Sequence, residues 1–302
     1  MWWTSKLLLR AACLLCTAGA WAAPTLPWFD GPRPGAQAQA AVALLAEAPS
    51  HGLDAEDYEA AALQHALAQA LQDPPLDAPA AARLDHALTA AMLRLLHDLH
   101  GGRVAPALSG HRVGTVAVRD PFNAADTLQA ALALQDLPLA VREAAPKLAQ
   151  YERLREALAR YRELVGDAAW HRPLPPLPRA LTPGATWPAA PLLAARLAAL
   201  GDLQADTSSQ RSADATAYDG TLVAAVRAFQ QRHGLDADGV IGRATWHALQ
   251  VPPAARVRQL ELALERLRST PLLQGPRMIV VNIPEFVLRA YEVQGERIVV
   301  RA

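Results

Sequence analysis

Cysteine and aromatic residues are scarce in this sequence of 302 residues, and neither sign of charge is in excess. Its two cysteines, Cys13 and Cys16, both lie near the N-terminus, and aromatic side chains make up only 5% of the chain. The 29 basic and 29 acidic residues give a formal net charge of zero. Because a dedicated nucleic-acid binder needs surplus basic side chains to neutralise phosphates, this balance argues against nucleic acid as a partner.

Residues 1–22 are typical of a cleavable secretory signal peptide. Lys6 and Arg10 give a positive start, residues 11–20 form a short apolar run, and Ala-Trp-Ala ends at Ala22 as a cleavage site. The run is shorter than the roughly 20 residues of a membrane-spanning helix, so we expect no stable membrane span after cleavage. An uncleaved anchor is the alternative. Cleavage would remove both cysteines, which excludes disulfides, a thiolate nucleophile and cysteine metal sites from the mature chain.

Helical patterns dominate from about residue 38 to residue 165. The hydrophobic share of 52% comes largely from alanine and leucine, a composition that favours helices. Asp77 and Asn123 precede apolar-periodic runs as N-caps, and Gly101-Gly102 is a stop signal. The sequence predicts helices over residues 38–48, 54–71, 78–100, 124–134 and 146–165, the last opened by Pro146.

Proline and glycine mark the organisation of the next part of the chain. Six prolines between residues 171 and 188 predict a linker, because so dense a stretch is neither helix nor central strand. A small helical unit follows, in which two Asp-Gly turns lead into helices over residues 221–233 and 243–249. Gly234 fits a left-handed C-cap, and Val240-Ile241 can pack down between the helices.

The pattern changes period near the C-terminus. An amphipathic helix is predicted over residues 252–268, followed by strands over 278–283, 286–293 and 297–301. Three short strands with an open edge rarely form a stable domain alone. We therefore interpret them as the opening strands of an incomplete β domain, and we expect residues 277–302 to promote aggregation.

We find no convincing catalytic, metal or cofactor site in the residue patterns. His97 and His100 lie three residues apart on one predicted helix, but without a third ligand they are better interpreted as boundary histidines. Single carboxylates such as Glu47 and Asp98 are usually solvated rather than catalytic. P-loop, GxSxG, HExxH and GxGxxG motifs are absent, so no metal or cofactor is predicted.

Residues 225–246 read AVRAFQQRHGLDADGVIGRATW. This stretch resembles the three-helix peptidoglycan-binding domain and follows its pattern AVxxFQxxxGLxxDGxxGxxT closely. The resemblance implies peptidoglycan as a partner, contacted through glycan or stem peptides. The candidate wall-binding residues are Arg227, Arg232, Arg243 and Trp246, since guanidinium groups suit carboxylates and an indole can stack on a sugar. The alternative, that Trp246 is a core residue and the arginines are solvated, is favoured for each residue taken singly.

The flanking sequences are similar to a second family. Residues 277–284 (RMIVVNIP) and 288–291 (LRAY) look like the opening strands of the L,D-transpeptidase catalytic domain, and the helix at 256–268 fits its lead-in. Tyr151, Leu154, Leu158 and Tyr161 resemble the end of that family's N-terminal scaffold. The resemblance implies an enzyme that crosslinks peptidoglycan in the periplasm. In that family a cysteine thiolate attacks the bond between diaminopimelate and the terminal D-alanine of a tetrapeptide stem, and a histidine acts as base.

The sequence departs from the transpeptidase pattern at its chemical centre. The family's nucleophile and base lie in an H…SxGC segment downstream of the opening strands, whereas no cysteine or histidine follows Met278. The resemblance therefore implies that this chain holds the noncatalytic scaffold and wall-binding part, either as a truncated or as a degenerate copy. A noncatalytic peptidoglycan-binding protein and a helical adaptor are the alternatives.

Together these patterns predict a mainly α fold with six segments. A helical scaffold and a three-helix module are followed by the first strands of a β domain. The expected segments are a signal peptide (1–22), a helical scaffold domain (23–170), a proline-rich linker (171–190), a peptidoglycan-binding-like module (191–252), a connecting helix (253–275) and the start of an L,D-transpeptidase catalytic domain (276–302).

Overall fold

The computed structural model describes residues 26–104, 122–177, 179–204, 215–269, 277–282, 287–294 and 297–301. The predicted signal peptide and residues 205–214 lie outside these ranges. The described protein is mainly α-helical, which confirms the predicted class of a helical scaffold and a helical module followed by short strands. None of its helices combines the length and the apolar character that crossing a bilayer requires.

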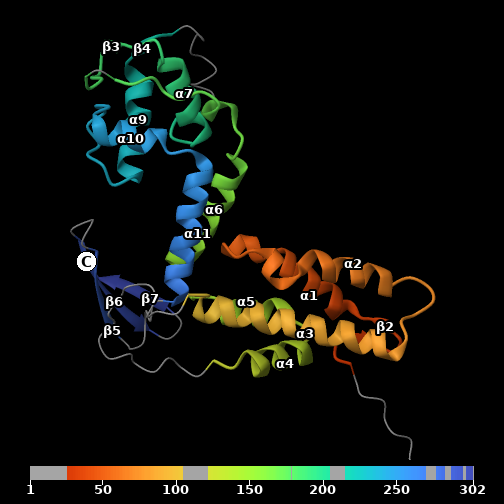
Figure 1. Ribbon diagram of the computed structural model, residues 1–302. Helices are drawn as coiled ribbons and strands as arrows, with labels where there is room; N and C mark the ends of the chain where they lie inside the picture. Colours follow the sequence, from red (N-terminus) through yellow and green to blue (C-terminus); the bar gives the residue numbers. More distant parts are fainter. Residues whose placement is uncertain are drawn as a thin grey trace, which may run out of the picture.

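Helix α3 (Ala78–Gly101) is the centre of the N-terminal half (Figure 1). The Asp77 carboxylate accepts a hydrogen bond from the backbone N–H of Ala80 at 2.7 Å and caps the helix, as predicted. Leucine and methionine recur at spacings of three and four along α3, so one face is buried. The elements packed around it are α1 (Ala36–Ala46), α2 (Ala60–Ala70), α4 (Ala124–Ala133) and α5 (Leu137–Ala144), preceded by strands β1 (Phe29–Asp30) and β2 (Arg33–Pro34).

Two helix starts differ from the prediction. Asp54 caps a short 3-10 helix, η2 (Ala55–Tyr58), and Glu59 then takes a left-handed conformation, so α2 begins only at Ala60. Asp136 caps the unpredicted helix α5, and the helix expected from Pro146 begins instead at Ala149.

Helices α6 (Ala149–Glu163) and α11 (Pro253–Ser269) lie side by side and link the two helical parts of the molecule (Figure 1). Tyr151, Leu158 and Leu264 form a small buried core between them. At one end Tyr151 contacts Arg268, whereas Tyr161 at the other end packs into the core of the helical module. The two helices therefore run in opposite directions between scaffold and module.

The helical module surrounds a second core. Leu193 and Leu197 of α7 (Ala190–Ala199) pack against Leu222 and Phe229 of α9 (Gly220–Arg232). The other described elements of this region are a short helix η4 (Ala168–Trp170), the paired strands β3 (Ala185–Thr186) and β4 (Ala217–Tyr218), and α10 (Arg243–Gln250).

Three antiparallel strands follow α11, in the order β5 (Arg277–Asn282), β6 (Val287–Gln294) and β7 (Arg297–Arg301). Their positions agree with the predicted strands to within one residue. Ile279 and Val281 alternate onto one face, and Leu288 lies opposite Val281 on the neighbouring strand. These three side chains are 57–67% exposed, so the described sheet has an apolar face in solvent.

Candidate functional site

The loop between α9 and α10 is held in place by the side chain of Gln230, which is almost fully buried. Its amide nitrogen donates to the Val240 carbonyl at 3.0 Å and to the Thr245 hydroxyl at 3.2 Å, and its oxygen accepts from the N–H of Gly239. Gly239 has φ of 77°, and a Cβ there would lie 2.8 Å from a Val223 methyl group. The turn at Asp238-Gly239 is therefore fixed by Gln230 and by the close approach of Val223. This turn sets the position of the start of α10.

A segment rich in proline packs against α10 on the other side. We call residues 174–177 and 179–181 the proline strap. Leu181 exchanges two backbone hydrogen bonds with Ile241, at 2.9 and 3.2 Å, and Leu174 accepts one from the Gln250 side chain at 2.7 Å. The predicted linker thus forms no long helix or strand, but Leu174 and Leu181 are buried in the core of the module.

A cavity of about 340 Å³ lies between the proline strap and the N-terminus of α10. We call it the Arg-Trp pocket. Buried Ile241 and the half-buried side chain of Trp246 give it apolar walls, and two exposed arginines, Arg179 and Arg243, also line it. The Trp246 Nε1–H donates to the Pro175 carbonyl at 3.2 Å, which fixes the ring. The lining residues are Pro176, Leu177, Arg179, Ala180, Ile241, Gly242, Arg243 and Trp246.

The four candidate wall-binding residues divide into two pairs. Arg243 and Trp246 both line the Arg-Trp pocket. Arg232 instead binds the Asp202 carboxylate with two nitrogens, at 2.5 and 3.1 Å, and the Tyr161 hydroxyl at 3.2 Å, so it joins α9 to its neighbours. Arg227 donates to the Asp238 carbonyl at 3.3 Å beside Gly239 and does not line the pocket.

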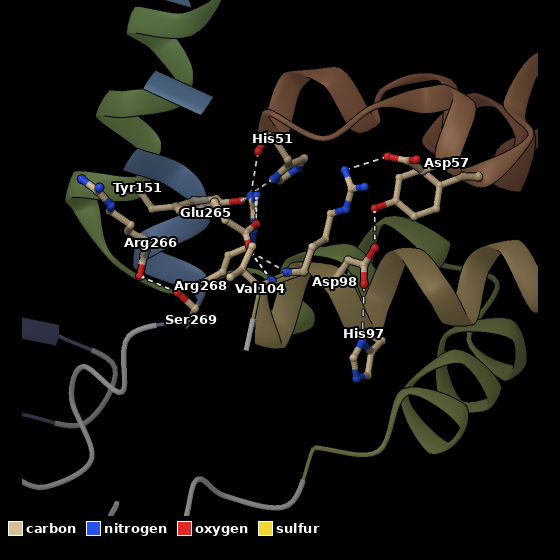
Figure 2. Close-up of polar contacts among 12 residues, drawn as sticks. His51, Asp57, His97, Asp98, Val104, Tyr151, Glu265, Arg266, Arg268 and Ser269 are labelled. Atoms are coloured by element: carbon tan, nitrogen blue, oxygen red, sulfur yellow. Dashed lines mark hydrogen bonds and ion pairs between the residues drawn. The ribbon is translucent and has the colours of Figure 1, made fainter. Parts of the chain in front are cut away.

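The described part of the chain has a second polar cluster, where α11 meets the scaffold (Figure 2). We call it the α11 clamp. Arg268 has no exposed surface, and it donates to the His51 carbonyl at 2.7 Å, the Tyr151 hydroxyl at 3.1 Å and the Glu265 carboxylate at 2.9 Å. Glu265 also accepts from the backbone N–H groups of residues 103 and 104, just after α3. Four segments of the chain are thereby joined at one end of α11.

Burial shapes the titration of the α11 clamp. It lowers the pKa of His51 to about 3, and the positive charges of Arg155 and Arg268 add to the effect. Burial acts to raise the pKa of Glu265, but hydrogen bonds from Arg268 and from the N–H of Val104 outweigh it and leave the pKa lowered. At neutral pH the clamp therefore combines a neutral imidazole with a paired carboxylate.

The two histidines that we interpreted as boundary residues contact different partners. The His97 side chain is largely exposed and lies 3.4 Å from the Asp98 carboxylate, whereas the His100 ring stacks on Phe122. Asp98 accepts a hydrogen bond from the Tyr58 hydroxyl at 2.9 Å. Among the residues that the structure describes, no three His, Cys, Asp or Glu side chains gather as metal ligands would.

Two family models match parts of the chain. A scaffold domain model matches residues 23–158, and the model of a putative peptidoglycan binding domain matches residues 189–249. No curated protein is similar enough in sequence to count as a match. The second model covers all of α7, α9 and most of α10, and therefore the α10 side of the Arg-Trp pocket. These findings support a wall-binding role and a cell-wall-associated location.

Sequence reasoning missed Arg179 and Arg268. Arg179 lies in the stretch that we interpreted as a linker, and contacts between distant residues, such as the pairing of Leu181 with Ile241, bring that stretch to α10. Arg268 occupies the last turn of an amphipathic helix, where an arginine is normally solvated. Its partners at residues 51 and 151 are more than 100 positions away, so no local signal could reveal its burial.

Proposed function

We propose that this chain attaches to bacterial peptidoglycan through the module at residues 189–249 and forms the noncatalytic part of a periplasmic L,D-transpeptidase. The observation that carries the proposal is the match of that module to a putative peptidoglycan binding domain, on a unit with an arginine-lined pocket. The scaffold match at residues 23–158 agrees with the same architecture. Export to the periplasm rests on the signal-like residues 1–22.

The sheet supports the transpeptidase part of the proposal. Strands β5, β6 and β7 follow directly in sequence from α11, whose C-terminal end is fixed to the scaffold by Arg268. Ile279, Val281 and Leu288 offer an apolar face of the kind that a larger β domain would cover. In such an enzyme, this chain would supply wall attachment and placement, and a cysteine-histidine segment would supply the acyl transfer.

Cosedimentation with purified sacculi tests wall attachment. The chain from Ala23 onward should pellet with sacculi, and it should stay in solution with cellulose particles as a control polymer. Equal recovery in both pellets, or none in either, would contradict wall attachment and favour the helical adaptor.

Translation of the DNA beyond codon 302 tests the transpeptidase part. A downstream histidine and SxGC segment is the expected result, and the longer protein should then release D-alanine from tetrapeptide stems, as measured by mass spectrometry. A genuine stop codon together with sacculus binding would instead support a noncatalytic peptidoglycan-binding protein.

A further inference from the structure

We propose that the Arg-Trp pocket binds a free carboxylate of a peptidoglycan stem peptide, rather than the glycan strand; this inference rests on the wall attachment proposed above. The pocket is formed jointly by the module and the proline strap, because Arg179 comes from the strap and Arg243 from α10. The residues matched to the peptidoglycan binding domain include only one of these two arginines.

Among the residues that the structure describes, the two pocket arginines, unlike the arginines around them, have no protein acceptor. Within the described ranges, Arg196 donates to three backbone carbonyls, Arg227 to the Asp238 carbonyl and Arg232 to the Asp202 carboxylate. Neither Arg179 nor Arg243 takes part in a hydrogen bond or ion pair among those residues. Both residues line the cavity, and no described residue accepts a hydrogen bond from their guanidinium groups.

The chemistry of these donors selects an anion. A guanidinium group presents parallel N–H donors that match the two oxygens of a carboxylate. Stem peptides carry free carboxylates, whereas the acetylated sugars of the glycan carry none once the stem is attached. The N-terminus of α10 adds positive potential next to the two arginines, since Gly242 provides no side-chain cap.

The apolar walls complement a short peptide end. The Trp246 ring is held by its bond to the Pro175 carbonyl, so its open face and buried Ile241 offer fixed contacts for an alkyl side chain. A volume of about 340 Å³ is small for a ligand pocket, where roughly 300–1,000 Å³ is usual. The pocket is therefore of a size that suits the end of a peptide. A glycan strand is too long to enter it and would lie across its opening.

The test compares intact sacculi, chitin, whose acetylated sugars carry no carboxylate, and a soluble tetrapeptide stem. The chain from Ala23 onward should bind intact sacculi and the tetrapeptide, measured by cosedimentation and calorimetry. It should bind chitin, and a tetrapeptide whose carboxylates are converted to amides, at least about tenfold more weakly.

Variants locate the binding in the pocket. Arg179→Gln with Arg243→Gln should weaken tetrapeptide binding about tenfold or more, while Arg258→Gln, an exposed arginine on α11, should leave it unchanged. Circular dichroism melting should be the same for all three proteins.

Three outcomes would overturn the inference while wall attachment stands. They are equal binding of chitin and intact sacculi, unchanged peptide binding in the double variant, and loss of sacculus binding in Trp246→Ala alone, which would indicate sugar stacking. Failure to bind intact sacculi at all would instead overturn the proposed function.

Discussion

Arg268 and Arg243 place the same guanidinium group in opposite surroundings. Arg268 is fully buried in the α11 clamp and bonded to a carboxylate, a carbonyl and a hydroxyl, whereas Arg243 is exposed and lines a cavity. Removing a buried, hydrogen-bonded cation leaves its partners unsatisfied, while removing an exposed one leaves almost nothing unsatisfied. The difference separates an arginine that holds the fold from one that is free for a ligand.

Substitution of Arg268 should have the largest effect on stability. Arg268→Met keeps an unbranched apolar stem but removes the guanidinium group that donates to Glu265 Oε2 and to the His51 carbonyl, which should cost about 3–5 kcal/mol. Arg243→Met should change stability by no more than about 0.5 kcal/mol. Urea unfolding followed by circular dichroism measures both, and similar midpoints for the two variants would remove the distinction.

The second-largest effect on stability is expected from acid, which should weaken the α11 clamp. The pKa of His51 is about 3 in the folded chain and 6.5 when unperturbed, so the unfolded state binds the extra proton between these values. The stability from neutral His51 is complete above about pH 6.5 and is lost as the pH falls towards 3, by at most about 1.4 kcal/mol per pH unit.

The lowered pKa of Glu265 acts in the same direction, but only at lower pH. His51→Gln should therefore flatten the decline in unfolding midpoint between pH 6.5 and pH 4.5. An unchanged slope in this variant would show that His51 does not control it.

The pocket region should respond more weakly to a change in its supporting turn. Gly239→Ala places a methyl group 2.8 Å from a Val223 methyl at φ of 77°, and should cost about 2 kcal/mol and reduce tetrapeptide binding. Gly234→Ala is the matched control, because φ is 66° but no atom lies within 4 Å of the added methyl. It should cost only about 1 kcal/mol and leave binding intact. Equal effects of the two variants on binding would mean that the turn does not position the pocket.

The smallest change in folding free energy is expected at the sheet. Ile279→Thr with Val281→Thr removes apolar surface that is already 60–67% exposed, so stability should change by less than about 0.5 kcal/mol. Light scattering on warming should nevertheless fall, because exposed apolar strands promote association. A large loss of stability would show that this face is covered in solution.

Local signals explain which parts of the fold could be predicted. Asp77 and Asn123 each cap a helix through their own side chain within three residues, so the start of α3 and of α4 is readable from the sequence. The same rule would have found α5, which begins after Asp136 with Pro138 in its first turn.

The candidate site was only half predictable. Arg243 and Trp246 lie three residues apart on one helix, and the family pattern marks their neighbourhood. Arg179 and Arg232 depend on contacts between distant segments, because one reaches the pocket through the proline strap and the other is bonded to Asp202. Charge and spacing along the sequence do not reveal which arginine forms an ion pair with a carboxylate of a distant segment.

The paired helices α6 and α11 set the distance between the module and the scaffold. Helix α11 has 17 residues, which at about 1.5 Å per residue sets a length of roughly 25 Å between the module at one end and the scaffold contact at the other. A stem bound in the Arg-Trp pocket would therefore be held about one α11 length away from the α11 clamp, so the helix pair would act as a spacer between bound wall and scaffold.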